Sequence, residues 1–171
     1  MPRYAAFLRG VSPLNAKMPA LRQAFESAGF SAVTTVLGSG NVVFDARRAS
    51  ETTLQRRAEA AMRERLGQSF LTIVRPVEHL HRLQAADPFR RFRLPPGAKR
   101  VVTFFVTEPA AHIAMPVEYQ GARLLALQGR ELFTAYVPGA KGAPFMALIE
   151  RTFGKAITTR TWETVARDAR A

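Results

Sequence analysis

Apolar runs and amphipathic stretches alternate in one order along the first 75 residues, and this order limits the fold more than any other feature of the sequence. Four short runs of apolar and β-branched residues predict strands, at residues 3–10, 32–37, 41–46 and 70–75. Two stretches with apolar side chains at helical spacing predict helices, at residues 19–28 and 51–66. The resulting β-α-β-β-α-β order is that of a ferredoxin-like unit.

The rest of the chain predicts a second, rearranged unit. A short helix at 77–86 must end near Asp87 and Pro88, because the residue before a proline disfavours helical backbone. Further strands are predicted at residues 100–107, 122–128, 131–138 and 156–162, and further helices at 144–153 and 163–169.

A pattern that occurs twice in the sequence favours the duplication of one subdomain. Pro19 and Gly29 are ten positions apart, as are Pro144 and Gly154, and within six residues after each glycine the chain has an apolar residue followed by Thr-Thr. The alternative is that helix start and stop signals alone produce this frame. We therefore expect an α+β fold of two ferredoxin-like (α/β plait) subdomains, residues 1–76 and 77–171, with mostly antiparallel sheet and helices packed on it.

Composition excludes several classes of protein. The 171 residues include no cysteine, which excludes disulfides, thiolate metal sites and a cysteine nucleophile. No run of about 18 apolar residues could span a membrane, and the N-terminal apolar stretch is too short for a signal peptide, so a cytoplasmic protein is expected. Histidines and carboxylates lack ligand spacing and no hydrolase motif occurs, so we expect no metal and no cofactor and leave catalysis open.

The formal net charge of +12 is spread evenly along the chain. Residues 1–75 carry 11 cations and 5 acids, and residues 76–171 carry 14 and 8, so each part has a charge of +6. Such a field attracts nucleic acids and other polyanions. The alternative is a merely basic surface, because 21 of the 25 cations are arginine and abundant arginine with alanine is typical of a GC-rich genome.

The stretch LGSGNVVF, residues 37–44, resembles a phosphate-binding loop at first sight. A phosphate loop needs glycines that lead into a helix, whereas these glycines lead into a predicted strand. The favoured interpretation is a tight turn with glycines at positive φ. Ser39 and Asn41 could still present polar groups at the edge of a sheet.

Other residues are better candidates for binding an anion. Lys17 and Lys141 each precede the N-terminus of a predicted helix, where a cation and free N–H groups can act on one anion. The alternative is that both are ordinary solvated loop lysines.

Two further groups are aromatic and basic. The first group is Arg90, Arg91 and Arg93, which are interspersed with phenylalanines. Such a mixture can bind the phosphate backbone of a nucleic acid. The alternative is an exposed linker, which can have the same pattern. Arg160 and Trp162 are predicted to lie on one face of the final strand and could line a pocket, although a core tryptophan is the alternative.

Several separated segments, among them FLRGV, MPALRQAFESAGF, SGNVVF, RVVTFFVTEP and TTRTWETV, resemble in order a bacterial family known as domain of unknown function 1697. The resemblance implies two ferredoxin-like subdomains and implies no activity. The residues that match the family's motifs are Arg9, Gly10, Lys17, Ser39, Gly40, Asn41, Thr159, Arg160 and Trp162. The chain departs from the pattern before Lys17 and at Thr161 and Glu163, where the family usually has asparagine.

The leading functional hypothesis is a non-catalytic protein that binds an anionic ligand, either a nucleic acid or a phosphorylated small molecule. The alternatives are an enzyme with a polar site between the subdomains, and a protein-interaction module. Arg9, Lys17, Ser39, Asn41 and Arg160 are predicted to include at least three residues that line one cleft. The sequence does not indicate the oligomeric state.

Overall fold

The computed structural model describes residues 1–139 and 142–171 as an α+β protein with two antiparallel sheets and helices packed on them, which confirms the predicted fold class at this level. The chain forms two compact units. Met1–Ala85 and Val165–Ala171 make the first unit, and Ala86–Thr164 makes the second. The predicted division between residues 76 and 77 differs from this one, because helix 77–86 and the chain's last residues group with the first sheet.

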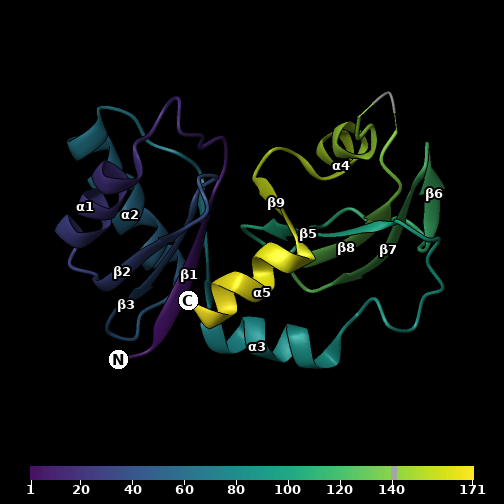
Figure 1. Cartoon of the computed structure of the whole chain (residues 1–171), viewed down its shortest axis with the longest axis horizontal. Helices are drawn as coiled ribbons and strands as arrows, with labels where there is room; N and C mark the ends of the chain where they lie inside the picture. Colours follow the sequence, from purple (N-terminus) through teal and green to yellow (C-terminus); the bar gives the residue numbers. More distant parts are fainter. Residues whose placement is uncertain (140–141) are drawn as a thin grey trace. The chain divides into compact units, whose positions relative to one another are not determined.

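The first unit contains a four-stranded sheet in the order β2-β3-β1-β4 (Figure 1). Its strands are β1 (Arg3–Leu8), β2 (Ser31–Val36), β3 (Asn41–Asp45) and β4 (Thr72–Pro76). Strand β1 pairs antiparallel with both β3 and β4, while β2 pairs only with β3. Strand β1 is therefore central and β2 lies at an edge.

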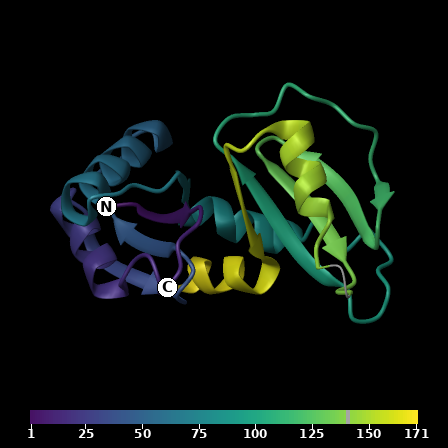
Figure 2. The ribbon, with the colours of Figure 1, turned by 90° about the horizontal axis from the view of Figure 1, so that it is seen from above.

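Helices α1 (Met18–Ser27) and α2 (Glu51–Leu66) cover one face of this sheet (Figures 1 and 2). Helix α2 has residues at both ends that favour a helix start and a helix end. Ser50 caps it by accepting a hydrogen bond from the Thr53 N–H, and Gly67 ends it in the left-handed conformation. Phe25 of α1 lies edge-on to Phe44 of β3, with 5.6 Å between ring centroids, so the helix is fixed to the sheet by aromatic packing.

The opposite face of the first sheet is also buried. Strand β1 is buried at every position from Tyr4 to Leu8, with no polar alternation, as expected of a strand that is covered on both sides. Helix α3 (Val77–Ala86) and the end of α5 (Trp162–Arg170) lie on this side (Figures 1 and 2). The His81 Nε2 lies 2.7 Å from the Ala169 carbonyl oxygen, which joins the two helices.

The second unit contains a five-stranded sheet in the order β6-β7-β8-β5-β9. Its elements are β5 (Lys99–Phe105), β6 (Val117–Tyr119), β7 (Ala122–Gln128), β8 (Glu131–Tyr136), α4 (Phe145–Phe153) and β9 (Ile157–Thr161). Phe145 and Ile149 of α4 are buried against apolar residues of this sheet, so α4 covers one of its faces.

Several observed elements differ from the predicted ones. The first strand was predicted to end at Gly10 and ends at Leu8, because Gly10 has a φ of +82°. Strand β6 was not predicted, since three residues give no detectable alternation. Trp162 begins α5 and does not lie on the last strand. Among the residues described, no helix has the length and apolar character needed to cross a bilayer.

The first prediction concerns Gly40, which has a φ of +86° and no room for a side chain. A Cβ there would lie 2.9 Å from the Leu8 carbonyl oxygen, an atom of the central strand. Gly10 has a φ of +82° but no atom within 4 Å of its notional Cβ, so Gly10→Ala is a matched control. We expect Gly10→Ala to cost about 1–2 kcal/mol from backbone strain alone. Gly40→Ala should lower the free energy of unfolding by clearly more, measured by urea denaturation, and an equal cost would contradict the steric argument.

Candidate ligand-binding site

Four predicted site residues come from segments that meet at one end of the first sheet. The Leu8 N–H donates to the Gly40 carbonyl at 2.8 Å, which places the β2–β3 turn beside the end of β1. The Arg9 N–H donates to the Leu71 carbonyl at 2.9 Å, just before β4 begins. This end of the sheet, called the loop end below, therefore gathers Arg9, Ser39 and Asn41, together with the loop that leads to Lys17.

Asn41 has a structural role in the β2–β3 turn. Its side chain is buried, and its Nδ2 donates to the Val36 carbonyl at 3.1 Å and to the Ser39 Oγ at 3.2 Å. These bonds close the turn from inside. Gly40 has positive φ as predicted, but Leu37 and not Gly38 is the second such residue. The turn is thus held by the amide of Asn41, and its exposed polar residue is Ser39.

The loop between β1 and α1 is held by a second asparagine. The Asn15 Oδ1 accepts from the Ser12 N–H at 2.8 Å, and its Nδ2 donates to the Gly10 carbonyl at 2.7 Å. The Gln68 side chain donates to the Asn15 carbonyl at 2.8 Å and fixes the loop to the segment before β4. These hydrogen bonds therefore fix the backbone of the loop that precedes Lys17.

Lys17 occupies the N-cap position of α1. Its backbone is extended, its side chain is exposed, and no side chain caps the helix. The first turn of α1 contains no acidic residue, and Pro19 lies in it. The N-terminal N–H groups of a helix carry partial positive charge, and here they lie beside a lysine instead of a carboxylate.

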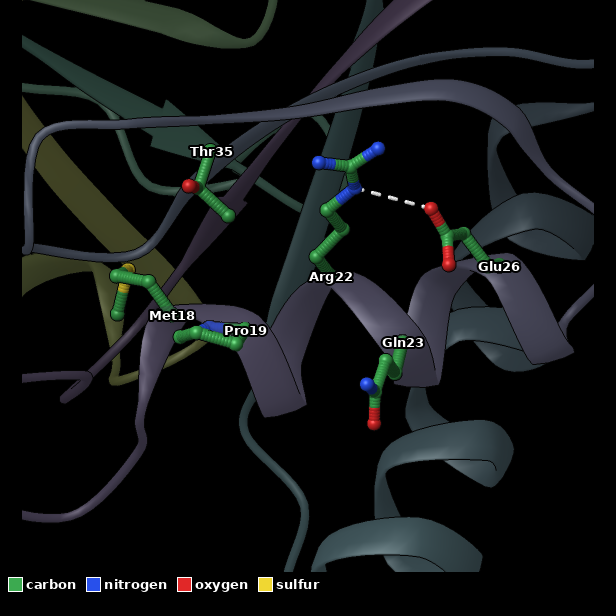
Figure 3. Close-up of a pocket in the computed structure, with 6 residues that line it drawn as sticks. All are labelled: Met18, Pro19, Arg22, Gln23, Glu26 and Thr35. Atoms are coloured by element: carbon green, nitrogen blue, oxygen red, sulfur yellow. Dashed lines mark hydrogen bonds and ion pairs between the residues drawn. The ribbon is translucent and has the colours of Figure 1, made fainter.

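A depression of about 390 Å³ starts at this end of α1 (Figure 3). It lies between α1 and β2, and its lining residues are Met18, Pro19, Arg22, Gln23, Glu26 and Thr35. The Arg22 Nε lies 3.0 Å from the Glu26 Oε1, and both side chains are about half exposed. An exposed pair of this kind contributes little to stability, so Arg22 can exchange Glu26 for another anion at small cost.

Arg160 lies in the second unit, where its strand neighbours bind it. Its Nη1 donates to the Thr158 Oγ1 at 2.7 Å and to the Thr159 carbonyl at 2.9 Å. The Thr159 hydroxyl in turn lies 2.8 Å from the Thr103 hydroxyl on β5. Arg160 and the loop end belong to different units, so the predicted cleft that includes both stays a prediction.

Trp162 is a core residue of the second unit. It is 6% exposed, and its ring lies edge-on to Phe89 at 5.1 Å and to Phe133 at 6.4 Å between centroids. Thr161 immediately before it caps α5, since its Oγ1 accepts from the Thr164 N–H. Asparagine caps helices as well as threonine does, so the departure from the family pattern at Thr161 preserves this role.

The basic segment of the second unit is exposed at its three arginines. Arg90 and Arg91 line a depression of about 330 Å³. The Arg90 Nε lies 3.8 Å from the Asp87 Oδ2, and the Arg91 guanidinium lies over the Phe92 ring at 4.9 Å. The Arg93 carbonyl accepts from Arg123. Lys141 falls outside the described residues.

Arg75 on β4 is a residue that the sequence analysis missed. It is the largest fully buried side chain among the described residues, and its Nη1 lies 4.0 Å from the Glu51 Oε2. The sequence does contain an indication of this burial. Arg75 stands two positions after Ile73, so both side chains lie on the same face of a strand whose other residues are mostly apolar and buried. Within residues 1–139 and 142–171, no group of three histidine or acidic side chains could hold a metal ion.

The chain belongs to a protein family of unknown function, DUF1697, whose model matches residues 1–133. This confirms the resemblance predicted from the motifs. A solved structure of a conserved bacterial protein from Streptococcus pneumoniae is similar in fold, with a TM-score of 0.68 and 19% sequence identity. The similarity covers 99% of this chain and 97% of that one. A search of curated proteins finds no match.

The second prediction tests the role of Trp162, the only tryptophan of the chain. Trp162→Ala should remove about 3–5 kcal/mol from the free energy of unfolding, because it leaves a cavity beside Phe89 and Phe133. Trp162→Phe keeps much of the aromatic packing and should cost less. Phe92→Ala, at a half-buried position, is the control that should cost least. Urea denaturation followed by circular dichroism measures all three, and unchanged stability of Trp162→Ala would refute a core role.

Proposed function

We propose that this member of the DUF1697 family is a non-catalytic binding protein for an anionic ligand, with the ligand's charged group at the N-terminus of α1. The observation that carries the proposal is that α1 begins at Lys17 with no side-chain cap and no acid in its first turn. A helix start that lacks its own carboxylate leaves partial positive charge for an outside anion.

The depression beside this helix start supports a small phosphorylated ligand. Its volume of about 390 Å³ lies within the range of small-molecule sites. A phosphate at Met18 and Pro19 would be near Lys17, and the rest of the ligand would extend along α1 past Arg22. Thr35 on β2 offers a hydroxyl on the opposite wall. Arg9 and Ser39 at the loop end belong to the same proposed surface.

A second candidate ligand is single-stranded nucleic acid, bound by the basic segment of the second unit. Three exposed arginines within four residues and a guanidinium over Phe92 support it. Arginines bind the phosphates in such proteins, and aromatic rings stack on the bases. The net charge of +12 would favour association with either ligand. A cytoplasmic location, an enzymatic site between the units and a protein-interaction role stay predictions.

We also infer that both units follow the ferredoxin-like plan and arose by duplication. The first unit supports this through its β-α-β-β-α-β order and its sheet order β2-β3-β1-β4. In the second unit, β7-β8-β5-β9 repeats that arrangement, since β5 pairs with both β8 and β9. Under this correspondence α4 matches α2, whereas the repeated sequence pattern pairs α4 with α1. Residues 106–116, which contain no helix, stand in the place of α1.

The third prediction concerns Lys17. A thermal-shift titration with glucose 6-phosphate and adenosine monophosphate should raise the melting temperature of the wild-type protein. Lys17→Ala should weaken the apparent affinity about two- to five-fold, the value of one charge near a helix terminus. Lys155→Ala is the matched control, because Lys155 is also exposed but lies after α4 in the second unit. An equal loss of affinity in both variants would mean that only the net charge of the protein matters, and it would contradict a site at α1.

The fourth prediction concerns the basic segment. If it binds single strands, the logarithm of the binding constant should fall with the logarithm of salt concentration by about 0.7 per phosphate contacted. Replacing Arg90, Arg91 and Arg93 by alanine should flatten this slope, as measured by fluorescence anisotropy with labelled oligonucleotides.

The control for this experiment is a triple variant with the same loss of charge elsewhere. Arg56, Arg63 and Arg65 on α2 are all exposed, and their replacement by alanine should leave most of the slope intact. A slope that changes equally in both triple variants would show that only the overall charge matters. The nucleic-acid candidate would then fail, while the proposal for α1 would stand on its own result.

A further inference from the structure

The first sheet has a second depression, at the end opposite to the loop end. At the loop end, Phe7 pairs with Asn41 and Leu8 pairs with Thr72. At the other end, Arg3 pairs with Asp45 and Tyr4 pairs with Pro76. Six strand residues at about 3.4 Å each separate the two ends by roughly 20 Å. The depression at the Arg3 end has a volume of about 410 Å³.

Cations outnumber acids in the lining of this depression. Its charged residues are Arg3, Arg48, Glu78 and Arg82, and His81 and Tyr4 also line it. They come from the start of β1, the segment before α2, and the first two turns of α3 (Figure 1). With Asp45, which pairs with Arg3, two carboxylates face the three arginines, so the depression keeps an excess of one positive charge. Arg48 lies two residues before the Ser50 cap of α2, on a part of the chain that the sequence motifs do not mark.

The three arginines differ in what already binds them. The guanidinium of Arg3 already has protein partners and is not counted as a ligand-binding group. Its Nη1 donates to the Asp45 Oδ1 at 2.8 Å, and its Nε donates to the Ala171 main-chain oxygen at 2.9 Å. Arg82 pairs with Glu78 at 3.2 Å, but both side chains are more than half exposed, so this pair is weak. Arg48 is exposed and has no ion-pair partner within residues 1–139 and 142–171.

The imidazole of His81 is also held in place. Its Nε2 lies 2.7 Å from the Ala169 carbonyl oxygen, which can only accept, so the Nε2 carries the hydrogen. The rest of the wall is apolar, and includes Pro2, Pro76 and Val77. A ligand here would meet the guanidinium groups of Arg48 and Arg82 and the apolar residues of the lining.

We propose that this depression binds a phosphate monoester of a small organic molecule. Arginines bind phosphate through paired N–H donors, and Arg48 with Arg82 can supply such donors to one dianion. The volume of about 410 Å³ fits a ligand larger than phosphate alone, and the apolar wall would contact its organic part. This site goes beyond the function proposed above, because it uses other residues at the other end of the sheet and does not require a ligand at α1.

The test is isothermal titration calorimetry with phenyl phosphate and, separately, with inorganic phosphate. Wild-type protein should bind phenyl phosphate more tightly than inorganic phosphate, because of the apolar wall. Arg48→Ala and Arg82→Ala should each weaken phenyl phosphate binding at least five-fold. Arg47→Ala is the matched control, since Arg47 is adjacent and exposed but does not line the depression. It should change the affinity less than two-fold.

Three results would overturn the proposal. Equal losses in the Arg47 and Arg48 variants would mean that only the overall field attracts the ligand. Equal affinity for phenyl phosphate and inorganic phosphate would remove the assignment to a monoester. Loss of binding in Lys17→Ala, with Arg48→Ala unaffected, would place the ligand at α1 and reject this site while supporting the other. Melting curves of the variants verify that each is folded, as expected for exposed positions.

Discussion

The burial of β1 on both faces is the constraint on which the first unit depends. Every residue from Tyr4 to Leu8 is at most 4% exposed, so neither face can meet water without loss of much of the hydrophobic stabilisation. Helices α1 and α2 cover the face that carries Tyr4, Ala6 and Leu8. The other face is covered by α3 and by residues 165–171. Residues 165–171 follow the whole second unit in sequence. The organisation of the chain into interleaved units is thus a consequence of one apolar strand.

The elements could be predicted from the sequence wherever local chemistry and tertiary packing favour the same structure. Helix α3 was predicted at residues 77–86 and occupies Val77–Ala86, because the Asp87-Pro88 pair ends it. Trp162 was misplaced because Thr161 can either extend a strand or cap a helix, and only the hydrogen bond from Thr164 decides between them. The division into units could not be predicted, because hydrophobic patterning does not specify which face a distant helix covers.

The candidate sites were predictable to different degrees. Motifs drew attention to Asn41, Gly40 and Trp162, and each has a structural explanation in hydrogen bonding, backbone conformation or packing. A motif records that a residue type is required and does not say whether a ligand or the fold requires it. The position of Lys17 at the start of α1 was predictable, whereas its role in binding stays a prediction. The depression at Arg48 and Arg82 has no motif, since sheet pairing brings its residues together from separate segments.

The docking of residues 165–171 on the first unit also bears on how the protein is made. At about 5–20 residues per second, the ribosome needs roughly 4–16 s to add residues 86–164 after the first 85 have been synthesised. During that interval the nascent first sheet lacks the segment that contributes Val165 and Ala169 to its unit. Its apolar surface is then open to chaperones or to neighbouring chains. The first unit is therefore completed only after the second unit has been synthesised, although its strands precede the second unit in the chain.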